Sequence, residues 1–227
     1  MKLGNLVSYV GASIFPFDML FDEHMSITDP NDVTKCDAIL LWGGEDIASS
    51  YYNQPAHPYN QNKSGMPSMR DQREWEAMTL ARLHQIPIIG VCRGAQFMCA
   101  FAGGRLIQHV NNHHNTHDVM VENPDGSRKV YQTSSCHHQM MDVRDLDEDH
   151  AVVLAWASGL SSVYEDFYGP VEAPEGKKFI TEPEAIYFPK IRGFAIQGHP
   201  EWMEKKDGYV KWCMDQIANL LLTERVE

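Results

Sequence analysis

The segment from Pro87 to Gln96 constrains this chain most, because it is typical of a strand that turns sharply into a helix. An apolar run ends in Gly90-Val91-Cys92, and a helical apolar pattern follows, so the cysteine lies at the corner. A helix N-terminus points unpaired N–H groups at such a side chain and favours its thiolate. Two interpretations follow, a catalytic cysteine or a buried free cysteine that ends a core strand.

A second segment near the C-terminus supplies the groups that a catalytic cysteine needs. The short apolar run 193–197 leads to His199, and Glu201 follows two residues later, with Pro200 stiffening the link. A thiol nucleophile needs a base, and the base needs an acceptor that fixes its tautomer. Taken singly, His199 is also typical of a strand end and Glu201 of a solvated loop. Together with Cys92 they predict a catalytic triad.

These motifs, taken together, resemble the class I glutamine amidotransferase superfamily. The features closest to its γ-glutamyl hydrolase branch, which includes γ-glutamyl-γ-aminobutyrate hydrolases, are a glycine loop, an Arg-Asp helix start and a His-His-Gln segment. Five segments between about residues 36 and 203 carry the resemblance: 42–47 (Trp-Gly-Gly-Glu-Asp-Ile), 70–74 (Arg-Asp-Gln-Arg-Glu), 90–96 (Gly-Val-Cys-Arg-Gly-Ala-Gln), 134–139 (Ser-Ser-Cys-His-His-Gln) and 197–201 (Gln-Gly-His-Pro-Glu). The chain departs from the family pattern at Ser134, where Asn is usual, at Gly198, where an aromatic residue is frequent, and in a short first βα unit.

The resemblance implies hydrolysis of a γ-glutamyl amide through a glutamyl thioester. Cys92 would be the nucleophile, His199 the base and acid, and Glu201 the group that orients His199. The oxyanion hole would use backbone N–H groups of Gly44 and Arg93. The residues expected to contact substrate are Gly43, Gln96, Ser135, His137, His138 and Gln139. Without the resemblance, Gly43-Gly44 is also typical of a plain turn, Gln96 of a helix surface, and Arg70-Asp71 of a helix start.

Three functions compete for this motif set. The first is a free-standing hydrolase that releases glutamate with ammonia or an amine. The second is a glutaminase subunit that delivers ammonia to a separate synthetase, and the third is a degenerate sensor of glutamyl ligands. The hydrolase-type motifs favour the first, and the intact Cys92, His199 and Glu201 argue against the third. The identity of the amine and the oligomeric state stay open.

The histidine-rich stretch 109–118 suggests a rival, metal-binding interpretation. His113 and His117 have the i,i+4 spacing of metal ligands on a helix, with His109 and His114 nearby. The asparagines between them make a poor helix, however. Because the resembling families need no metal or other cofactor for this chemistry, the sequence predicts a polar pocket wall or loop here and no metal.

Composition limits the partners and the compartment. The net charge of −12 provides no basic surface for nucleic acid. No apolar run has membrane-spanning length, and the first residues lack the apolar core of a signal peptide. The five cysteines are scattered, without a CxxC pair, which predicts reduced thiols. We therefore expect a cytoplasmic enzyme of one domain, residues 1–227, with a small-molecule γ-glutamyl substrate.

Alternating strand and helix patterns predict an α/β fold, a three-layer sandwich with a mostly parallel central sheet. The resemblance implies the flavodoxin-like fold of class I glutamine amidotransferases. Ligands in such sheets bind beyond the carboxyl ends of the strands, where Gly43, Cys92 and His199 fall. We expect strands at 5–10, 25–28, 38–42 and 193–197, edge strands at 162–168 and 184–189, helices at 17–23, 71–83, 92–102 and 207–225, a turn at 123–126 and a loop or lid at 53–69.

Overall fold

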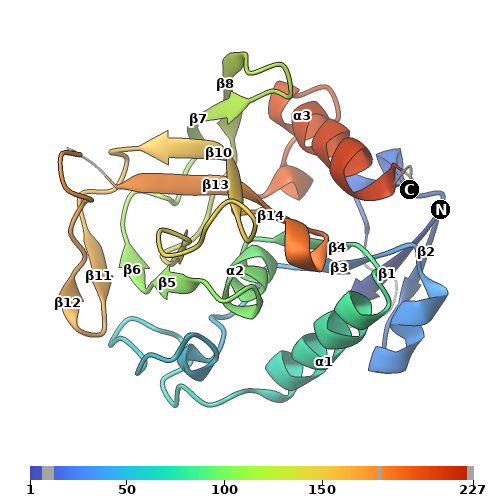
Figure 1. Ribbon diagram of the computed structural model, residues 1–227, viewed down its shortest axis with the longest axis horizontal. Coiled ribbons are helices and arrows are strands. Elements are labelled where there is room, and N and C mark those ends of the chain that lie inside the picture. The colour runs from blue at the N-terminus through green and yellow to red at the C-terminus, as the bar shows by residue number, and fades with distance from the viewer. Residues whose placement is uncertain (7–12, 178–179, 224–227) are drawn as a thin grey trace.

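The computed structural model describes residues 1–6, 13–177 and 180–223, and these form three layers around a large sheet (Figure 1). The helices are α1 (Met69–Leu83), α2 (Arg93–Phe101) and α3 (Gly208–Ile217), with a π-helical turn at Ala218–Leu222 and short 3-10 helices at Phe17–Met19, Pro30–Lys35, Ser49–Tyr52, Pro189–Ile191 and Pro200–Trp202. The strands are β1 (Lys2–Leu6), β2 (Glu23–Ser26), β3 (Ala38–Leu41), β4 (Ile88–Val91), β5 (Arg105–Ile107), β6 (His109–Val110), β7 (His117–Glu122), β8 (Arg128–Thr133), β9 (Met140–Asp142), β10 (Val152–Ser158), β11 (Tyr164–Asp166), β12 (Gly169–Pro170), β13 (Thr181–Phe188) and β14 (Gly193–Ile196).

The central sheet has the strand order β2-β1-β3-β4-β14-β13-β10-β7-β8. Each neighbouring pair from β2 to β14 is parallel, and each pair from β14 to β8 is antiparallel. The half that carries the predicted site is therefore wholly parallel. The predicted α/β fold with a mostly parallel central sheet is confirmed.

Two hydrophobic cores lie on opposite faces of the sheet because side chains alternate along each strand. Ile39 and Ile88 pack with α1 and α2 in one core. Leu40 and Ile89 pack with the apolar side of α3 in the other. Figure 1 accordingly shows α3 and the pair α1 and α2 on opposite sides of the sheet. The continuous apolar runs of β3 and β4 are what a strand buried on both faces requires.

Close packing brings α2 against the end of β3. A Cβ atom built on Gly94 would lie 2.4 Å from the carbonyl oxygen of Leu41, so only glycine allows this approach. Helix α1 begins with a capping box in which Ser68 and Asp71 bond each other's backbone N–H groups. The starts of the two helices are thereby fixed beside the strand ends.

Most predicted elements are found, with shifted ends. The turn at 123–126 joins the antiparallel strands β7 and β8. The first strand begins earlier than predicted, at Lys2, and the predicted residues 7–10 lie outside the described residues. The predicted helix at 17–23 is only a 3-10 turn, and the last helix passes into a π-helical turn, with 224–225 outside the described residues.

Two strand assignments were wrong in their position. The segment 162–168 was predicted to be an edge strand, but β11 is the middle strand of a small sheet with the order β12-β11-β6. The segment 184–189 was predicted to be an edge strand, but β13 lies inside the sheet between β14 and β10. Glu182 and Glu184 gave this strand a polar pattern, yet both side chains are fully buried. Their partners come from distant segments, which strand periodicity cannot reveal.

None of the helices in the described part of the chain combines the length and apolar character that a membrane crossing requires.

Candidate active site

Three parallel strands end side by side and deliver the predicted site residues. Leu41 of β3 pairs with Gly90 of β4, and Ile196 of β14 pairs with Val91 of β4. The residues that follow these strands emerge at the same edge of the sheet, where open α/β sheets bind their ligands. The glycine loop, Cys92 and the His199 segment therefore meet at one place.

Cys92 occupies a strained corner between β4 and α2. Its backbone has φ 51° and ψ −109°, a conformation that non-glycine residues rarely adopt. A strained residue at a sharp strand-to-helix turn is the backbone pattern of a nucleophile elbow. Burial raises the pKa of the Cys92 thiol to about 12, although a hydrogen bond from the Arg93 backbone opposes this rise. Desolvation thus outweighs the helix N-terminus, and the resting side chain is a thiol.

His199 is held in the tautomer that a general base needs. Its Nδ1 lies 2.7 Å from Glu201 Oε1, and because a carboxylate only accepts, Nδ1 carries the hydrogen. Nε2 therefore carries no hydrogen in this tautomer, and it is buried without a hydrogen-bond partner. The indole of Trp202 stacks on the imidazole with ring centroids 3.7 Å apart and planes 4° from parallel. The ring is therefore fixed in orientation as well as in tautomer.

Gly43 lies close to both Cys92 and His199. A Cβ atom built on Gly43 would lie 3.3 Å from His199 Cε1 and 3.9 Å from Cys92 Sγ. The backbone of the glycine loop thus contacts both groups, and a side chain at this position would press against the base and the nucleophile. These distances show that the glycine loop, Cys92 and His199 belong to one site.

An ion-pair network sets the conformation of the glycine loop. Arg70 Nη2 donates to the carbonyls of Trp42 and Gly43 at 2.9 and 3.1 Å, and Arg70 Nε donates to Glu74 at 2.7 Å. A Cβ atom on Gly44, which has φ +146°, would lie 2.4 Å from Arg70 Nη1. Because peptide units are planar, holding these two carbonyls also fixes the direction of the N–H groups of Gly43 and Gly44.

Comparison with known proteins places this chain in a family. The model of the Peptidase C26 family matches residues 12–164, which include the glycine loop, Cys92 and the segment 134–139. The chain belongs to the Peptidase C26 family. The glutamine amidotransferase-like protein YvdE of Lactococcus lactis subsp. lactis is 27% identical over 206 residues, covering 83% of this chain and 76% of YvdE. Its homologue from subsp. cremoris is 31% identical over 171 residues, covering 63% of this chain and 87% of the homologue.

Solved structures support the same fold. A glutamine amidotransferase from Thermotoga maritima superposes with a TM-score of 0.56 at 12% identity, covering 96% of this chain and 92% of that one. The glutaminase domain of a Trypanosoma brucei CTPS, with bound acivicin, has a TM-score of 0.56 at 14% identity, covering 99% and 95%. The C26 family match and the glutamine amidotransferase-like relatives support the class I glutamine amidotransferase superfamily and a hydrolase-type enzyme, and the solved structures support the fold. The assignment to the γ-glutamyl hydrolase branch stays a prediction.

Some residues of the segment 134–139 contact the site of this C26 chain, and others contact the interior of the protein. The backbone N–H of His199 donates to the Ser134 carbonyl at 2.9 Å, and Gln96 Nε2 donates to the Gln139 carbonyl at 2.9 Å. His138 lies 3.0 Å from Asp46, which also accepts from the backbone of Gln61 in the segment 53–68.

Two predicted substrate-binding side chains point elsewhere. The Ser135 hydroxyl donates to the His113 carbonyl at 3.0 Å, and the buried His137 ring lies beside His113 and Glu184. Their side chains therefore serve the interior of the protein.

Sequence reasoning missed several residues that shape the site. Glu74 ties Arg70 to Arg93, and its i,i+4 spacing from Arg70 on a helix was the available signal. Trp202 directly follows the motif 197–201, and no role was predicted for it. Arg70 and Asp71, for which a helix start was an equal alternative, both belong to the ion-pair network.

The Arg93 side chain is a structural anchor. It is buried and bonds both Asp71 and Glu74, joining α2 to α1. We expect Arg93→Met to destabilise the fold by about 3–5 kcal/mol, because two buried carboxylates lose their cation. The measurement is the free energy of unfolding in denaturant. Arg105→Met, which removes an exposed pair with Asp145, is the matched control and should cost about 1 kcal/mol or less. Equal losses would contradict the anchoring role.

A cavity of about 890 Å³ opens beside the glycine loop. Gly44, Asp46 and Arg93 line one side of it, and residues 61–64 and 66–69 line the other. The predicted lid segment 53–69 thus forms a wall of the space next to the candidate oxyanion hole.

The raised pKa of Cys92 predicts that its side chain is a thiol at rest, and the rate of alkylation tests this. In a Cys136→Ser background, which removes the exposed cysteine, alkylation of Cys92 by iodoacetamide should accelerate about tenfold per pH unit from pH 7 to 10. The reason is that only the thiolate reacts and its fraction keeps rising below a pKa of about 12. Peptide mapping by mass spectrometry gives the rate at each pH. A plateau below pH 8 would show a thiolate already formed at rest.

Proposed function

We propose that this chain hydrolyses a γ-glutamyl amide through a glutamyl thioester on Cys92. The observation that carries the proposal is the meeting of Cys92, at its strained corner, with His199 across Gly43, while Glu201 holds His199 Nδ1 at 2.7 Å. Nucleophile, base and orienting acceptor are the parts that thiol catalysis of acyl transfer needs.

The proposed chemistry has two halves. In the first, Cys92 Sγ attacks the δ-carbonyl carbon as its proton passes to His199 Nε2, and that proton then leaves with the ammonia or amine as the C–N bond breaks. In the second, His199 takes a proton from water as the water oxygen attacks the thioester, and glutamate leaves as the proton returns to Sγ. Because the resting thiol is neutral, attack and proton transfer are coupled.

The proposed oxyanion hole consists of the backbone N–H groups of Gly44 and Arg93. Arg70 supports this role, because its bonds to the Trp42 and Gly43 carbonyls fix the peptide units of the loop before substrate arrives. Donors that are fixed beforehand stabilise the oxyanion without a reorganisation cost. This geometry favours an enzyme that works without a partner protein.

The glutamyl end of the substrate is proposed to bind beside Gln96 and Gln139. Both side chains are buried, and Gln139 has an amide group without a hydrogen-bond partner. Gly43 and His138 would contact the same substrate end, whereas Ser135 and His137 would act by fixing the backbone of their loop. The leaving amine would occupy the cavity bounded by 61–69, so this segment would select the amine.

The experiment measures glutamate release by the purified chain alone. Glutamine, γ-glutamyl-γ-aminobutyrate and a γ-glutamyl polyamine are supplied in turn, with the Cys92→Ala chain as the matched control. We expect turnover of at least one substrate by the unmodified chain. If no glutamate is released from any of the three substrates until a synthetase from the same source is added, the result would instead support an ammonia-donating subunit. Tight binding of a substrate without turnover would support a glutamyl-ligand sensor.

A further inference from the structure

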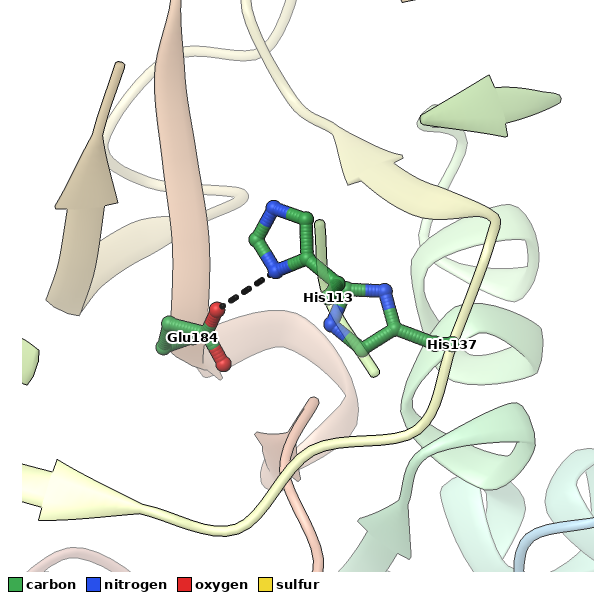
Figure 2. Close-up of side chains that lie close together, drawn as sticks. All are labelled: His113, His137 and Glu184. Atoms are coloured by element: carbon green, nitrogen blue, oxygen red, sulfur yellow. Dashed lines mark ion pairs between the residues drawn. The ribbon is translucent and has the colours of Figure 1, made fainter. Parts of the chain in front are cut away.

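Two histidines and a glutamate form a buried cluster in which one histidine comes from the segment 134–139 (Figure 2). His113 precedes β7, His137 lies in that segment, and Glu184 comes from β13. One potential ligand atom from each residue lies within 4.8 Å of the other two. The relative exposures are 0%, 5% and 0%, so the cluster is closed to bulk water. The proposed hydrolysis uses none of these side chains as a reacting group.

Several polar atoms of this cluster have no hydrogen-bond partner. They are both ring nitrogens of His113, Nε2 of His137 and Oε2 of Glu184. The nearest carboxylate oxygens lie 3.5 Å from His113 Nδ1 and 3.9 Å from His113 Nε2, which is beyond normal hydrogen-bond length. Buried polar atoms are costly unless they are paired, so the arrangement implies a further occupant.

His137 presents a lone pair to this space. Its Nδ1 lies 2.8 Å from the Gln139 carbonyl oxygen, which only accepts, so Nδ1 carries the hydrogen. Nε2 is therefore the unprotonated nitrogen, and it faces His113 and Glu184. Histidine ligands of metals characteristically donate their other N–H to a carbonyl or carboxylate, which fixes the ring in this way.

The remaining groups support Glu184 as a ligand. His117 Nε2 lies 3.0 Å from Glu184 Oε1, which orients the carboxylate and leaves Oε2 free. The neighbouring Glu182 is already satisfied, because it accepts from the backbone N–H of Ser161 at 2.8 Å and from the Tyr164 hydroxyl at 2.5 Å. Two buried carboxylates in one place also call for a compensating positive charge.

We propose that His113, His137 and Glu184 bind one divalent transition-metal ion. Zinc is the ion that these ligands fit best. Two imidazole nitrogens and a carboxylate oxygen are ordinary zinc ligands, at about 2.0–2.2 Å from the metal. A metal at that distance sets its ligand atoms about 3–4 Å apart, so the cluster has to contract slightly around the ion. The site uses His113 from the predicted histidine-rich stretch, but with His137 and Glu184 in place of a helical i,i+4 pair.

The ion would brace the wall of the active site. The His113 carbonyl accepts from the backbone of His137 and the hydroxyl of Ser135, and Ser134 bonds the backbone of His199. A metal that joins His113, His137 and Glu184 therefore ties this wall to β7 and β13. Its role is structural and does not depend on the proposed hydrolysis.

The test titrates the tag-free, metal-depleted full chain with Zn²⁺ and follows binding by calorimetry and the Tm by scanning calorimetry. We expect one equivalent to bind and the Tm to rise. His113→Gln and Glu184→Gln should weaken the affinity at least about tenfold. His114→Gln is the matched control, because His114 is an exposed histidine next to His113, and it should bind like the unmodified chain.

Co²⁺ provides a second readout on the unmodified chain, independent of whether any variant folds. A Co²⁺-loaded chain should show the visible absorption of Co²⁺ bound to two nitrogen ligands and one oxygen ligand of the protein, and Zn²⁺ should displace the Co²⁺. Absence of stoichiometric binding to the unmodified chain would overturn the proposal and leave a proton on His113 as the occupant. Binding that survives His113→Gln but is lost in His114→Gln would overturn it as well, because the ion would then sit at the surface.

Discussion

Cys92→Ala is expected to lower the rate of γ-glutamyl amide hydrolysis by about 10³-fold or more. The proposed thioester cannot form without the sulfur atom of Cys92. The fold should lose only about 1 kcal/mol, since alanine keeps the Cβ atom and vacates the space of one buried atom. Initial rates and the free energy of unfolding, measured on the same preparation, separate the two effects.

Cys213→Ala is the matched control for Cys92→Ala. Cys213 is also buried, but it belongs to α3 and packs in the core on that face of the sheet. The Cys213→Ala chain should lose about as much free energy of unfolding as the Cys92→Ala chain and should keep its activity. Full activity in the Cys92→Ala chain would remove this residue from the mechanism.

His199→Ala is expected to cost about as much activity as Cys92→Ala, because nucleophile and base act as one unit. Glu201→Gln should cost about 10–100-fold less than His199→Ala, since the glutamate orients the ring and moves no proton. The stacked Trp202 contributes to the same orientation, which limits the damage when Glu201 is neutralised. Rates for the single variants and for the double variant His199→Ala with Cys92→Ala provide the measurement.

The ranking of these two variants is the informative result. The double variant should be no slower than either single variant at Cys92 or His199. A Glu201→Gln chain that is slower than the His199→Ala chain would reverse the assigned roles. Additive losses in the double variant would show that the two residues do not act as a unit.

The parts of the site that follow single strands were predictable from the sequence. Gly43 and Cys92 come directly after apolar runs and His199 follows one by three residues, and parallel strands bring such positions to one edge of a sheet. The partner of His199 was predictable too, because Glu201 is only two residues away. Local order along the chain was therefore enough to assemble the candidate triad.

The parts that depend on pairing between distant segments were not predictable. Strand β13 reads as an edge strand because of Glu182 and Glu184, whose partners come from segments far away in sequence. The same limit applies to His113, whose spacing suggested His117 as its partner. In the fold the two rings do lie side by side, with centroids 5.2 Å apart, but His117 Nε2 contacts Glu184, and His113 forms the cluster with His137 and Glu184.

Electrostatics at Cys92 illustrate a further limit. A helix N-terminus was expected to favour the thiolate, and the Arg93 backbone bond acts in that direction. Burial of the thiol outweighs it, however, and burial depends on how β3, β4 and β14 pack around the corner. A residue's position on a helix is readable from sequence, whereas its desolvation is a property of the whole fold.

The most direct test of the account is to look for the glutamyl thioester itself. The purified chain is mixed with a γ-glutamyl amide that it turns over, quenched in acid within one turnover, digested and mapped by mass spectrometry. The account predicts a glutamyl adduct on the peptide that contains Cys92, which hydroxylamine removes and which is absent from the Cys92→Ala chain. Turnover with an adduct on another cysteine, or turnover with no adduct under conditions where a synthetic glutamyl thioester survives the quench, would contradict it.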